Sequence, residues 1–572
     1  LVAVIFIVSI IRHESALETL QFALVLIVAA IPAALPAVLS ITMAVGATAL
    51  AHREAIVSRL VAIEEMAGVD VLCSDKTGTI TENKLTLAEI APFEGFDEDA
   101  VLLDAILASR EEDQDPIDIA IIESERAGNL KDQVSSCTIT AFKPFDAVVK
   151  RTEAKVRTSD GREFSVAKGA PQVILALAGG GEDLSRKIDR LSEKFAGMGY
   201  RMLGVARSDA PDSWIYAGVL ALHDPPRADS AETIRTAMDM GLDVRMVTGD
   251  HVAIAREVAR EVNLRTDIAT ADAFIDKPDE EAAEVVEGAA GFAEVFPEHK
   301  YRIVSLLQSR GHIVGMTGDG VNDAPALKKA DVGIAVAGAT DAAKSAAGIV
   351  LTKPGLSVII DAIKESRMIF QRMDRYVIYR ISETIRVLFF ITFAILLFGF
   401  FPITALMIVL LALLNDIPIM TIAWDNVLYS RSPERWEMKR ILTLATLIGI
   451  VGVVSSFIML AIVEGPLNLD INSIRSLIFL KLAVAGHLTI FVVRTRGPFW
   501  SVRPAPALLW SAIATKVAAT LIAVYGFAIT PIGWPLAIFV WVYALIWAFV
   551  ITDPIKVALY RLIDRGALPP VR

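Results

Sequence analysis

The sequence predicts a multidomain protein, in which an α-helical transmembrane bundle carries a soluble α/β region. Two observations predict this fold class. Hydrophobic residues make up 54% of the 572-residue chain, yet the charged residues gather mostly between about 51 and 375. The flanks instead hold apolar runs of roughly 20 residues, the length that a helix needs to cross a membrane. Because a chain of this length is too long for one compact core, we expect several domains.

The apolar flanks are interpreted as one incomplete span followed by seven complete ones. One or two of these segments could be buried core helices, but seven in one chain favour a membrane protein. The incomplete span is Leu1–Ile11, and the others lie near Leu20–Leu50, Val377–Phe400, Ile403–Ile422, Leu442–Val463, Ile474–Val493, Ala507–Phe527 and Trp534–Ile551.

The connectors between the spans differ in charge, and this difference predicts their orientation. Basic residues follow Ile422, Val493 and the last span, whereas the alternate connectors Gly399–Pro402, Glu464–Ser473 and Ala528–Gly533 contain no Lys or Arg. Lys and Arg favour the cytoplasmic side of a membrane. We therefore expect the soluble region to lie in the cytoplasm, where ATP is found.

The cysteine count and the net charge limit the compartment and the kinds of partner that we expect for this protein. Two cysteines, Cys73 and Cys137, are too few for a disulfide framework and suit a reducing compartment. The net charge of −11 argues against a nucleic-acid partner. A lipid bilayer is the expected surrounding of the apolar spans, and a homo-oligomer stays open.

The run Cys73-Ser74-Asp75-Lys76-Thr77-Gly78-Thr79 is the most informative stretch of the chain. A strand-like segment, Val69–Cys73, delivers the Asp75 carboxylate to a polar, glycine-containing turn. A carboxylate placed in this way can act as a nucleophile and form an aspartyl-phosphate. The amides and hydroxyls that follow, including those of Lys76 and Thr77, can hold phosphoryl oxygens.

Further strand candidates, Val244–Val247, Ile313–Met316 and Val332–Val336, alternate with helical stretches and predict a parallel sheet. Ligands bind outside the carboxyl ends of such strands. Phosphoryl transfer needs acidic residues that gather Mg²⁺ beside the phosphate, and Asp319 is the strongest candidate for a metal ligand. The loops after these strands supply Thr248, Gly249, Asp250, Asp319, Asn322 and Asp323, and the segment before the second supplies the positive charge of Lys300.

These motifs resemble those of the P-type ATPases, the ion pumps that pass through a phospho-aspartate. The Asp75–Thr79 run resembles their phosphorylation signature, and the run from Thr317 to Leu327 resembles their hinge motif. The resemblance implies a cytoplasmic haloacid-dehalogenase-like phosphorylation domain with an inserted α+β nucleotide-binding domain. It also implies ATP as substrate, Mg²⁺ as cofactor, and a metal site formed by Asp75, Thr77, Asp319 and Asp323.

The insert resembles the family's nucleotide-binding domain. Lys168 and Gly169 match the motif whose Lys lines the ATP pocket, and Phe145 and Lys150 match an aromatic that stacks on adenine and a nearby cation. Arg227 resembles a hinge residue that contacts phosphate. Three neighbours of Phe145 depart from the usual pattern of the family, namely Asp146, Ala147 and Val149.

The choice of cargo depends on the membrane, where ionisable groups are costly and usually functional. Pro32 and Pro36 lie four residues apart and are expected to unwind their span, which frees carbonyls for a binding site. Asp416, next to Asn415, is the acid deep in its own span, and Arg386 is its expected partner one helix away. One carboxylate and one guanidinium are too little for a dehydrated metal ion but enough for a proton.

The resemblance thereby narrows to the plasma-membrane proton pumps, and it implies that Asp416 takes the proton while Arg386 controls its release. We expect ATP-driven proton export across the plasma membrane by a multi-pass protein. A pump for Na⁺, K⁺ or a divalent metal is an alternative, as is a membrane-tethered phosphatase or inactive scaffold of the same fold. Lys481 and Lys516 are expected to snorkel or pair locally, and Glu383 departs from the small polar residue that the family suggests.

The chain begins at Leu1 within an apolar run and contains no Thr-Gly-Glu, the motif that positions water for dephosphorylation in the family. We therefore expect a truncated pump without the actuator domain and the first membrane hairpin, and with a short tail. The expected parts are membrane helices at 1–50, stalk and first phosphorylation segment at 51–87, nucleotide-binding domain at 88–215, second phosphorylation segment at 216–355, stalk at 356–375, six membrane helices at 376–552 and tail at 553–572.

Overall fold

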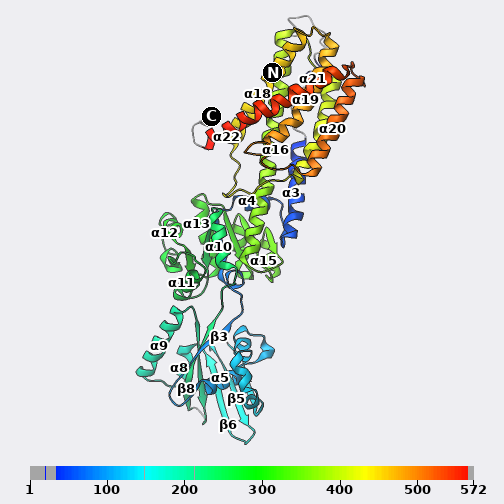
Figure 1. Cartoon of the computed structure of the whole chain (residues 1–572). Coiled ribbons are helices and arrows are strands. Elements are labelled where there is room, and N and C mark those ends of the chain that lie inside the picture. The colour runs from blue at the N-terminus through cyan, green and yellow to red at the C-terminus, as the bar shows by residue number, and fades with distance from the viewer. Residues whose placement is uncertain are drawn as a thin grey trace. The chain divides into compact units, whose positions relative to one another are not determined.

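The computed structural model describes residues 34–146, 148–210 and 213–564, together with residues 20, 23 and 27. The chain divides into two compact units, one formed by residues 53–65 and 69–362 and the other by residues 1–52, 66–68 and 363–572 (Figure 1). The expected span Leu1–Ile11, Pro32 and the last residues of the tail lie outside the described residues.

The first unit contains an eight-stranded sheet, with the order β1-β14-β13-β12-β2-β9-β11-β10. Every neighbouring pair is parallel except β1 with β14. The four strands expected from the sequence are present, shifted by one or two residues at their ends. The strands are β1 (Ala55–Val57), β2 (Val71–Asp75), β9 (Asp243–Val247), β10 (Ile268–Thr270), β11 (Gly291–Ala293), β12 (Val314–Gly318), β13 (Val332–Ala335) and β14 (Ile349–Leu351).

Helices pack against this sheet, which explains why its central strands read as continuous apolar runs. Val71 and Cys73 of β2 are buried in one core with Met316 of β12 and Val247 of β9. This core fixes the edge at which the motif loops meet. The helices are α4 (Val61–Gly68), α10 (Ser230–Asp239), α11 (Val252–Glu261), α12 (Asp279–Gly288), α13 (Pro297–Ser309), α14 (Ala324–Lys329) and α15 (Asp341–Ala346).

A second, antiparallel sheet of six strands forms the insert, with the order β3-β8-β7-β6-β5-β4. Its edge pair β3 and β8 extends beyond the expected range 88–215 at both ends. The strands are β3 (Thr86–Pro92), β4 (Cys137–Lys143), β5 (Arg151–Thr158), β6 (Glu163–Gly169), β7 (Arg201–Ser208) and β8 (Trp214–His223). Its helices are α5 (Glu98–Leu107), α6 (Pro116–Ile122), α7 (Lys131–Ser135), α8 (Pro171–Leu177) and α9 (Glu182–Gly197).

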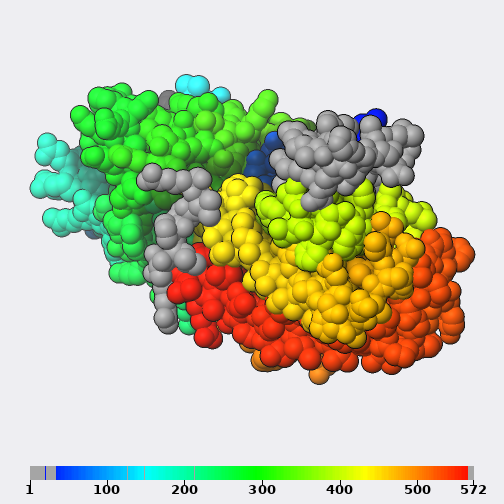
Figure 2. Space-filling model, turned by 90° about the horizontal axis from the view of Figure 1, so that it is seen from above, coloured from blue at the N-terminus to red at the C-terminus, as the bar shows by residue number. Residues whose placement is uncertain are grey.

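The second unit is a helix bundle, and among the described residues seven helices are long and apolar enough to cross a membrane. Figure 2 shows the later helices, coloured yellow to red, packed side by side. The most enclosed is α19, of whose most apolar window 83% is buried, against 44% or less for the others. These seven are α3 (Ala34–His52), α16 (Leu356–Phe398), α17 (Ala405–Met420), α18 (Met438–Glu464), α19 (Ile471–Val493), α20 (Pro506–Tyr525), and one span in which α21 (Gly533–Ile546) continues through Trp547–Thr552 into α22 (Asp553–Asp564).

The predicted fold class is confirmed in its architecture: a parallel α/β region with an inserted antiparallel sheet is joined in sequence to a bundle of apolar helices.

Candidate functional site

Strand β2 ends at Asp75, and the neighbouring strand β12 holds that residue in place. Asp75 N donates to Thr317 Oγ1 at 2.8 Å, across the parallel pairing of the two strands. The chain then turns through residues 76–80, where Thr77 N donates to Asp75 Oδ1 at 3.4 Å. Gly78 has φ +73°, a conformation that favours glycine, so the tight turn depends on it. Asp75 is thereby fixed at the carboxyl edge of the sheet.

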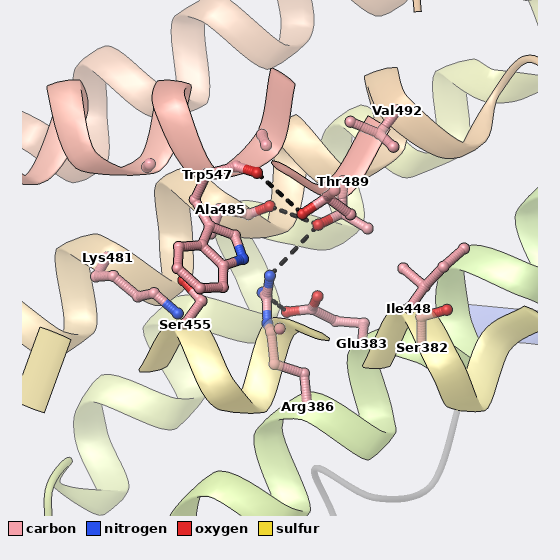
Figure 3. Close-up of a pocket in the computed structure, with 14 residues that line it drawn as sticks. Ser382, Glu383, Arg386, Ile448, Ser455, Lys481, Ala485, Thr489, Val492 and Trp547 are labelled. Carbon is pink, nitrogen blue, oxygen red and sulfur yellow. Dashed lines mark hydrogen bonds and ion pairs between the residues drawn. The ribbon is translucent and has the colours of Figure 1, made fainter. Parts of the chain in front are cut away.

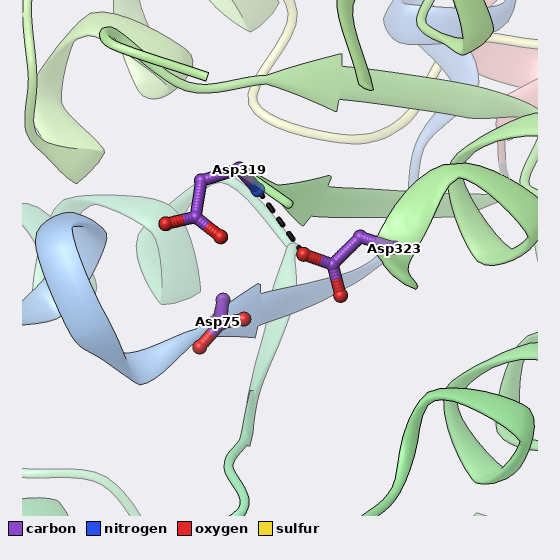
Figure 4. Close-up of side chains that lie close together, drawn as sticks. All are labelled: Asp75, Asp319 and Asp323. Atoms are coloured by element: carbon purple, nitrogen blue, oxygen red, sulfur yellow. Dashed lines mark hydrogen bonds between the residues drawn. The ribbon is translucent and has the colours of Figure 1, made fainter. Parts of the chain in front are cut away.

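Three carboxylates converge at this edge (Figure 4). Oxygen atoms of Asp75, Asp319 and Asp323 all lie within 4.8 Å of one another. Asp323 also shapes the loop, because its Oδ2 accepts hydrogen bonds from Asp319 N at 3.2 Å and Gly320 N at 3.1 Å. Carboxylate oxygens are the ligands that Mg²⁺ prefers, so the residues fit this ion. Thr77, the fourth expected ligand, contributes its backbone amide to Asp75 and is not part of the carboxylate cluster.

Lys300, from α13, compensates two of these carboxylates. Its Nζ lies 2.6 Å from Asp75 Oδ2 and 2.8 Å from Asp323 Oδ1, and the residue is 8% exposed. Burial raises the pKa of Asp75, and the Lys300 ammonium opposes that rise. Burial lowers the pKa of Lys300, but the two carboxylates outweigh it, so that the pKa is raised overall and the ammonium stays charged.

The loop after β9 forms the other side of the site. Asp250 Oδ2 lies 2.8 Å from Lys76 Nζ, and its Oδ1 lies 3.0 Å from Arg201 Nη2. Burial raises the pKa of Asp250, but these two cations outweigh it, so the pKa is lowered overall. Thr248 Oγ1 accepts from Asp250 N at 3.1 Å and holds the loop, in which Gly249 lies between them. Asn322 is exposed, in the loop that also bears Asp319.

A separate cavity of about 630 Å³ lies in the insert, and four of the five residues expected to bind ATP line it: Phe145, Lys150, Lys168 and Gly169. This volume falls in the range of small-molecule pockets, roughly 300–1,000 Å³. The fifth residue, Arg227, is not among the lining residues of this cavity. Its backbone N donates to Ile80 O at 3.0 Å, so it lies beside the phosphorylation loop instead.

The unusual residues next to Phe145 have a structural role. Asp146 Oδ1 accepts hydrogen bonds from Val148 N and Val149 N, each at 2.8 Å, and so closes a turn in which Lys150 adopts φ +55°. This turn carries Phe145 and Lys150 to the cavity. Ala147 lies outside the described residues.

Sequence reasoning missed three residues that the structure adds to the site. Thr317 lies within the recognised hinge motif and could have been found there. Asp118 Oδ1 lies 2.5 Å from Lys168 Nζ, and both groups are buried. Arg201 lines the 630 Å³ cavity and also a second one of about 280 Å³, which Lys76 and Asp250 line as well. Asp118 and Arg201 carry no motif signal, because their partners are distant in sequence.

The expected pair of Asp416 with Arg386 is wrong. Asp416 Oδ1 lies 3.8 Å from Arg380 Nη1, whereas Arg386 pairs with Glu383, one helical turn before it on α16. A partner three residues away on the same helix is available without any tertiary contact, and it takes the guanidinium. Arg386 also donates to Leu482 O at 3.3 Å.

The remaining membrane residues are placed as follows. Asn415 is buried next to half-buried Asp416, and Pro36 lies within α3, of whose described residues it is the third. Lys481 donates to Ser456 Oγ, and Lys516 donates to Ala483 O. Both lysines therefore pair locally inside the bundle.

Comparison with known proteins adds independent findings. A family model described as haloacid dehalogenase-like hydrolase matches residues 69–331. The chain is 53% identical over 569 residues to a protein of Methanocaldococcus jannaschii named as a cation-transporting ATPase, covering 98% of this chain and 70% of that protein. It is 42% identical over 587 residues to a protein of Dictyostelium discoideum named as a plasma membrane ATPase, covering 96% of this chain and 55% of that protein. The chain thus spans only part of the length of these relatives.

Proposed function

Because this chain belongs to the P-type cation-transporting ATPase family, we propose that it carries the catalytic and membrane parts of a pump that exports protons. The cell membrane is the proposed location, with the catalytic domains in the cytoplasm. The observation that carries this proposal is the position of Asp75, whose carboxylate pairs with Lys300 and lies close to two further carboxylates at the edge of the sheet.

In the proposed phosphoryl transfer, a carboxylate oxygen of Asp75 attacks the γ-phosphorus of ATP. The new P–O bond forms as the bond to the β–γ bridging oxygen breaks, and ADP leaves with that electron pair. Lys300 lies 2.6 Å from Asp75 and stabilises the charge on the transferred group. Mg²⁺, when bound, neutralises charge on the phosphates, and Asp75, Asp319 and Asp323 would hold it.

The cavity of the insert is the proposed ATP site. Phe145 is 59% exposed, so its ring is free to stack on adenine, and Lys150 supplies a nearby cation. Lys168 is held in a fixed position by Asp118 and presents its stem to the cavity. Asp115 and Arg201 line both this cavity and the one beside Lys76, so the triphosphate would extend toward Asp75 along them.

Asp416 is the proposed proton acceptor in the membrane. A guanidinium 3.8 Å away repels a metal cation but permits a carboxyl group to bind and release a proton. A Ca²⁺ site would need 6–8 oxygen ligands, whereas the ion-pair partner of Asp416 is a guanidinium, that of Arg380. Arg380 therefore replaces Arg386 as the residue that controls Asp416 in this proposal.

ATP-driven acidification of vesicles that contain the complete natural protein tests this function. We expect acidification by the parent, loss of all turnover in Asp75→Asn, and loss of proton transport in Asp416→Asn. Proton transport at the parental rate by Asp416→Asn would contradict the proton assignment. ATP hydrolysis that depends on Na⁺, K⁺ or a divalent metal, without acidification, would favour another cation. Phosphatase activity without any ATP turnover would favour the tethered-phosphatase alternative.

A further inference from the structure

The membrane bundle contains a buried carboxylate that the proposed function does not use, that of Glu383 on α16. Its side chain is 6% exposed, and one oxygen accepts from Arg386. The other oxygen, Oε2, is fully buried and has no hydrogen-bond partner within the described parts of the chain. A buried charged oxygen without a hydrogen-bond donor destabilises the folded protein. A proton or a water molecule bound to Oε2 would remove this cost.

Glu383 faces a polar cavity of about 30 Å³ within the bundle (Figure 3). Arg386, Ser455, Lys481, Thr489 and Trp547 also line it. A volume of this size has room for at least one water molecule. The Arg386 guanidinium and the Glu383 carboxylate contact one another directly at its edge, and the Lys481 amine points toward Ser455. Water in this cavity would bring protons within reach of Glu383.

Two glycines make room for these charged groups. A Cβ at Gly486 of α19 would lie 3.3 Å from both Glu383 Oε1 and Arg386 Nη2, and 3.4 Å from Asn415 Nδ2. A Cβ at Gly452 of α18 would lie only 2.6 Å from Arg386 Cδ. The helices therefore approach closely where Glu383 and Arg386 meet Asn415, the neighbour of Asp416. The cavity and the proposed proton acceptor belong to one polar region.

The basic side chains near Glu383 come from three helices. Arg386 lies on its own helix, Lys481 on α19 and Lys516 on α20, and both lysine side chains interact electrostatically with the carboxylate. His487, also on α19, interacts with Lys516 and Arg386. The Arg386 guanidinium already pairs with one oxygen of Glu383 and disfavours a metal cation beside it, whereas a proton can bind to the other oxygen.

We propose that Glu383 is a second proton-binding group on the transport path. Its Oε2 takes a proton from cavity water when Arg386 moves away and returns the proton when Arg386 pairs with it again. Tyr379 interacts electrostatically with Glu383 and Arg386 and also with Arg380 and Asp416. The two carboxylates therefore lie in one polar region of the bundle, both interacting with this tyrosine. This inference rests on the proposed function, because it requires that protons are the cargo.

The number of protons transported per ATP tests the inference, measured in vesicles with the complete protein. We expect two in the parent and a twofold lower ratio in Glu383→Gln, with ATP hydrolysis retained. Thr392→Val is the matched control, since Thr392 is buried on the same helix, does not line the cavity and has an unpartnered hydroxyl among the described residues. This control is expected to keep the parental ratio.

The outcomes separate the inference from the proposed function. Parental acidification with an unchanged ratio in Glu383→Gln contradicts the second site alone, whereas absence of acidification in the parent contradicts proton export itself. If Glu383→Gln does not fold, the parent protein alone still tests the inference, with a pH indicator that counts protons per phosphorylation cycle. One proton per cycle overturns the inference, and two protons per cycle support it.

Discussion

The charged groups around Asp75 at the sheet edge and those around Glu383 in the membrane unit are compensated differently. At the sheet edge, Lys300 lies within 2.8 Å of both Asp75 and Asp323, and Lys76 lies within 2.8 Å of Asp250. In the membrane unit, one oxygen of Glu383 accepts from Arg386, and the Lys481 and Lys516 side chains interact with the carboxylate electrostatically. Unpartnered atoms within the described residues include Glu383 Oε2, Arg386 Nε and Asn415 Oδ1.

This difference matches two kinds of chemistry. Phosphoryl transfer benefits from charges that are fixed in advance, because no reorganisation is then needed during the reaction. An ion carrier must instead exchange partners between binding and release, and unpaired atoms leave room for that exchange. We therefore expect substitutions at the sheet edge to abolish chemistry, and substitutions in the cavity to alter the coupling between chemistry and transport.

The largest expected effect is that of Asp75→Asn. An amide of the same size keeps the packing but removes the nucleophile, so phosphoenzyme formed from radiolabelled ATP should fall by at least about 1,000-fold. Asp416→Asn should still form phosphoenzyme, which would separate the two regions. Asp276→Asn, on an exposed loop, is the control. Phosphoenzyme at the parental level in Asp75→Asn would refute the assignment of the nucleophile.

Lys300→Gln should lower the rate of phosphorylation by about 100-fold at pH 7, which corresponds to about 2.7 kcal/mol. The lysine opposes the burial that raises the pKa of Asp75. Without Lys300, Asp75 should ionise only at higher pH, and the acid limb of the rate profile should move upward in pH. The profile is measured by rapid-quench phosphorylation, with exposed Lys328→Gln as control. An unmoved acid limb would show that Lys300 does not set the ionisation of Asp75.

Gly318→Ala should destabilise the phosphorylation region by about 1–3 kcal/mol. Its Cβ would lie 2.6 Å from the Cβ of Asp323, a short side chain that cannot turn away. Gly320→Ala, whose nearest contact would be 3.6 Å, is the matched control. Gly452→Ala in the membrane unit should cost less, because the flexible Arg386 stem can move. Thermal unfolding of the parent and the three variants measures the ranking of these stability losses. Equal unfolding midpoints for Gly318→Ala and Gly320→Ala would contradict the predicted ranking.

Phe145→Ala should have the smallest effect, a loss of about 3- to 10-fold in ATP affinity with no change in stability. The ring is 59% exposed, so its removal leaves no internal cavity, and a stacking contact is worth about 0.5–1.5 kcal/mol. Titration with a fluorescent ATP analogue measures the affinity. Val148→Ala, at an 89% exposed residue of the same turn, serves as control. An unchanged affinity would remove Phe145 from the nucleotide site.

Much of the catalytic region was predictable from the sequence. The apolar segments of β2, β9 and β12 and the polar loops after them were recognisable, and the ends of neighbouring parallel strands meet at one edge. The convergence of Asp75 with Asp319 follows from this rule. The pairing of Asp118 with Lys168 does not follow from any such rule, because 50 residues separate the two in sequence.

The membrane region was predictable only in outline. The spans were recognisable by length and apolarity, and seven such helices are present among the described residues. The ion-pair partner of Asp416 could not be recognised from the sequence, because Arg380 and Arg386 lie on the same helix and either could have faced Asp416. Glu383, three residues before Arg386, was the available signal that Arg386 had a nearer partner.

The sequence by itself determined which chemical groups this protein brings to its two units, since strand ends, motif loops and apolar spans are set by local pattern. Apart from the Glu383–Arg386 pair within one helix, the tertiary structure decided which of those groups compensate one another. That choice depends on how each helix is rotated and how closely its neighbours approach, as Gly452 and Gly486 permit around Arg386. Charges in a low-dielectric interior act strongly over a few ångströms, so these small displacements decide which carboxylate is paired and which oxygen stays free.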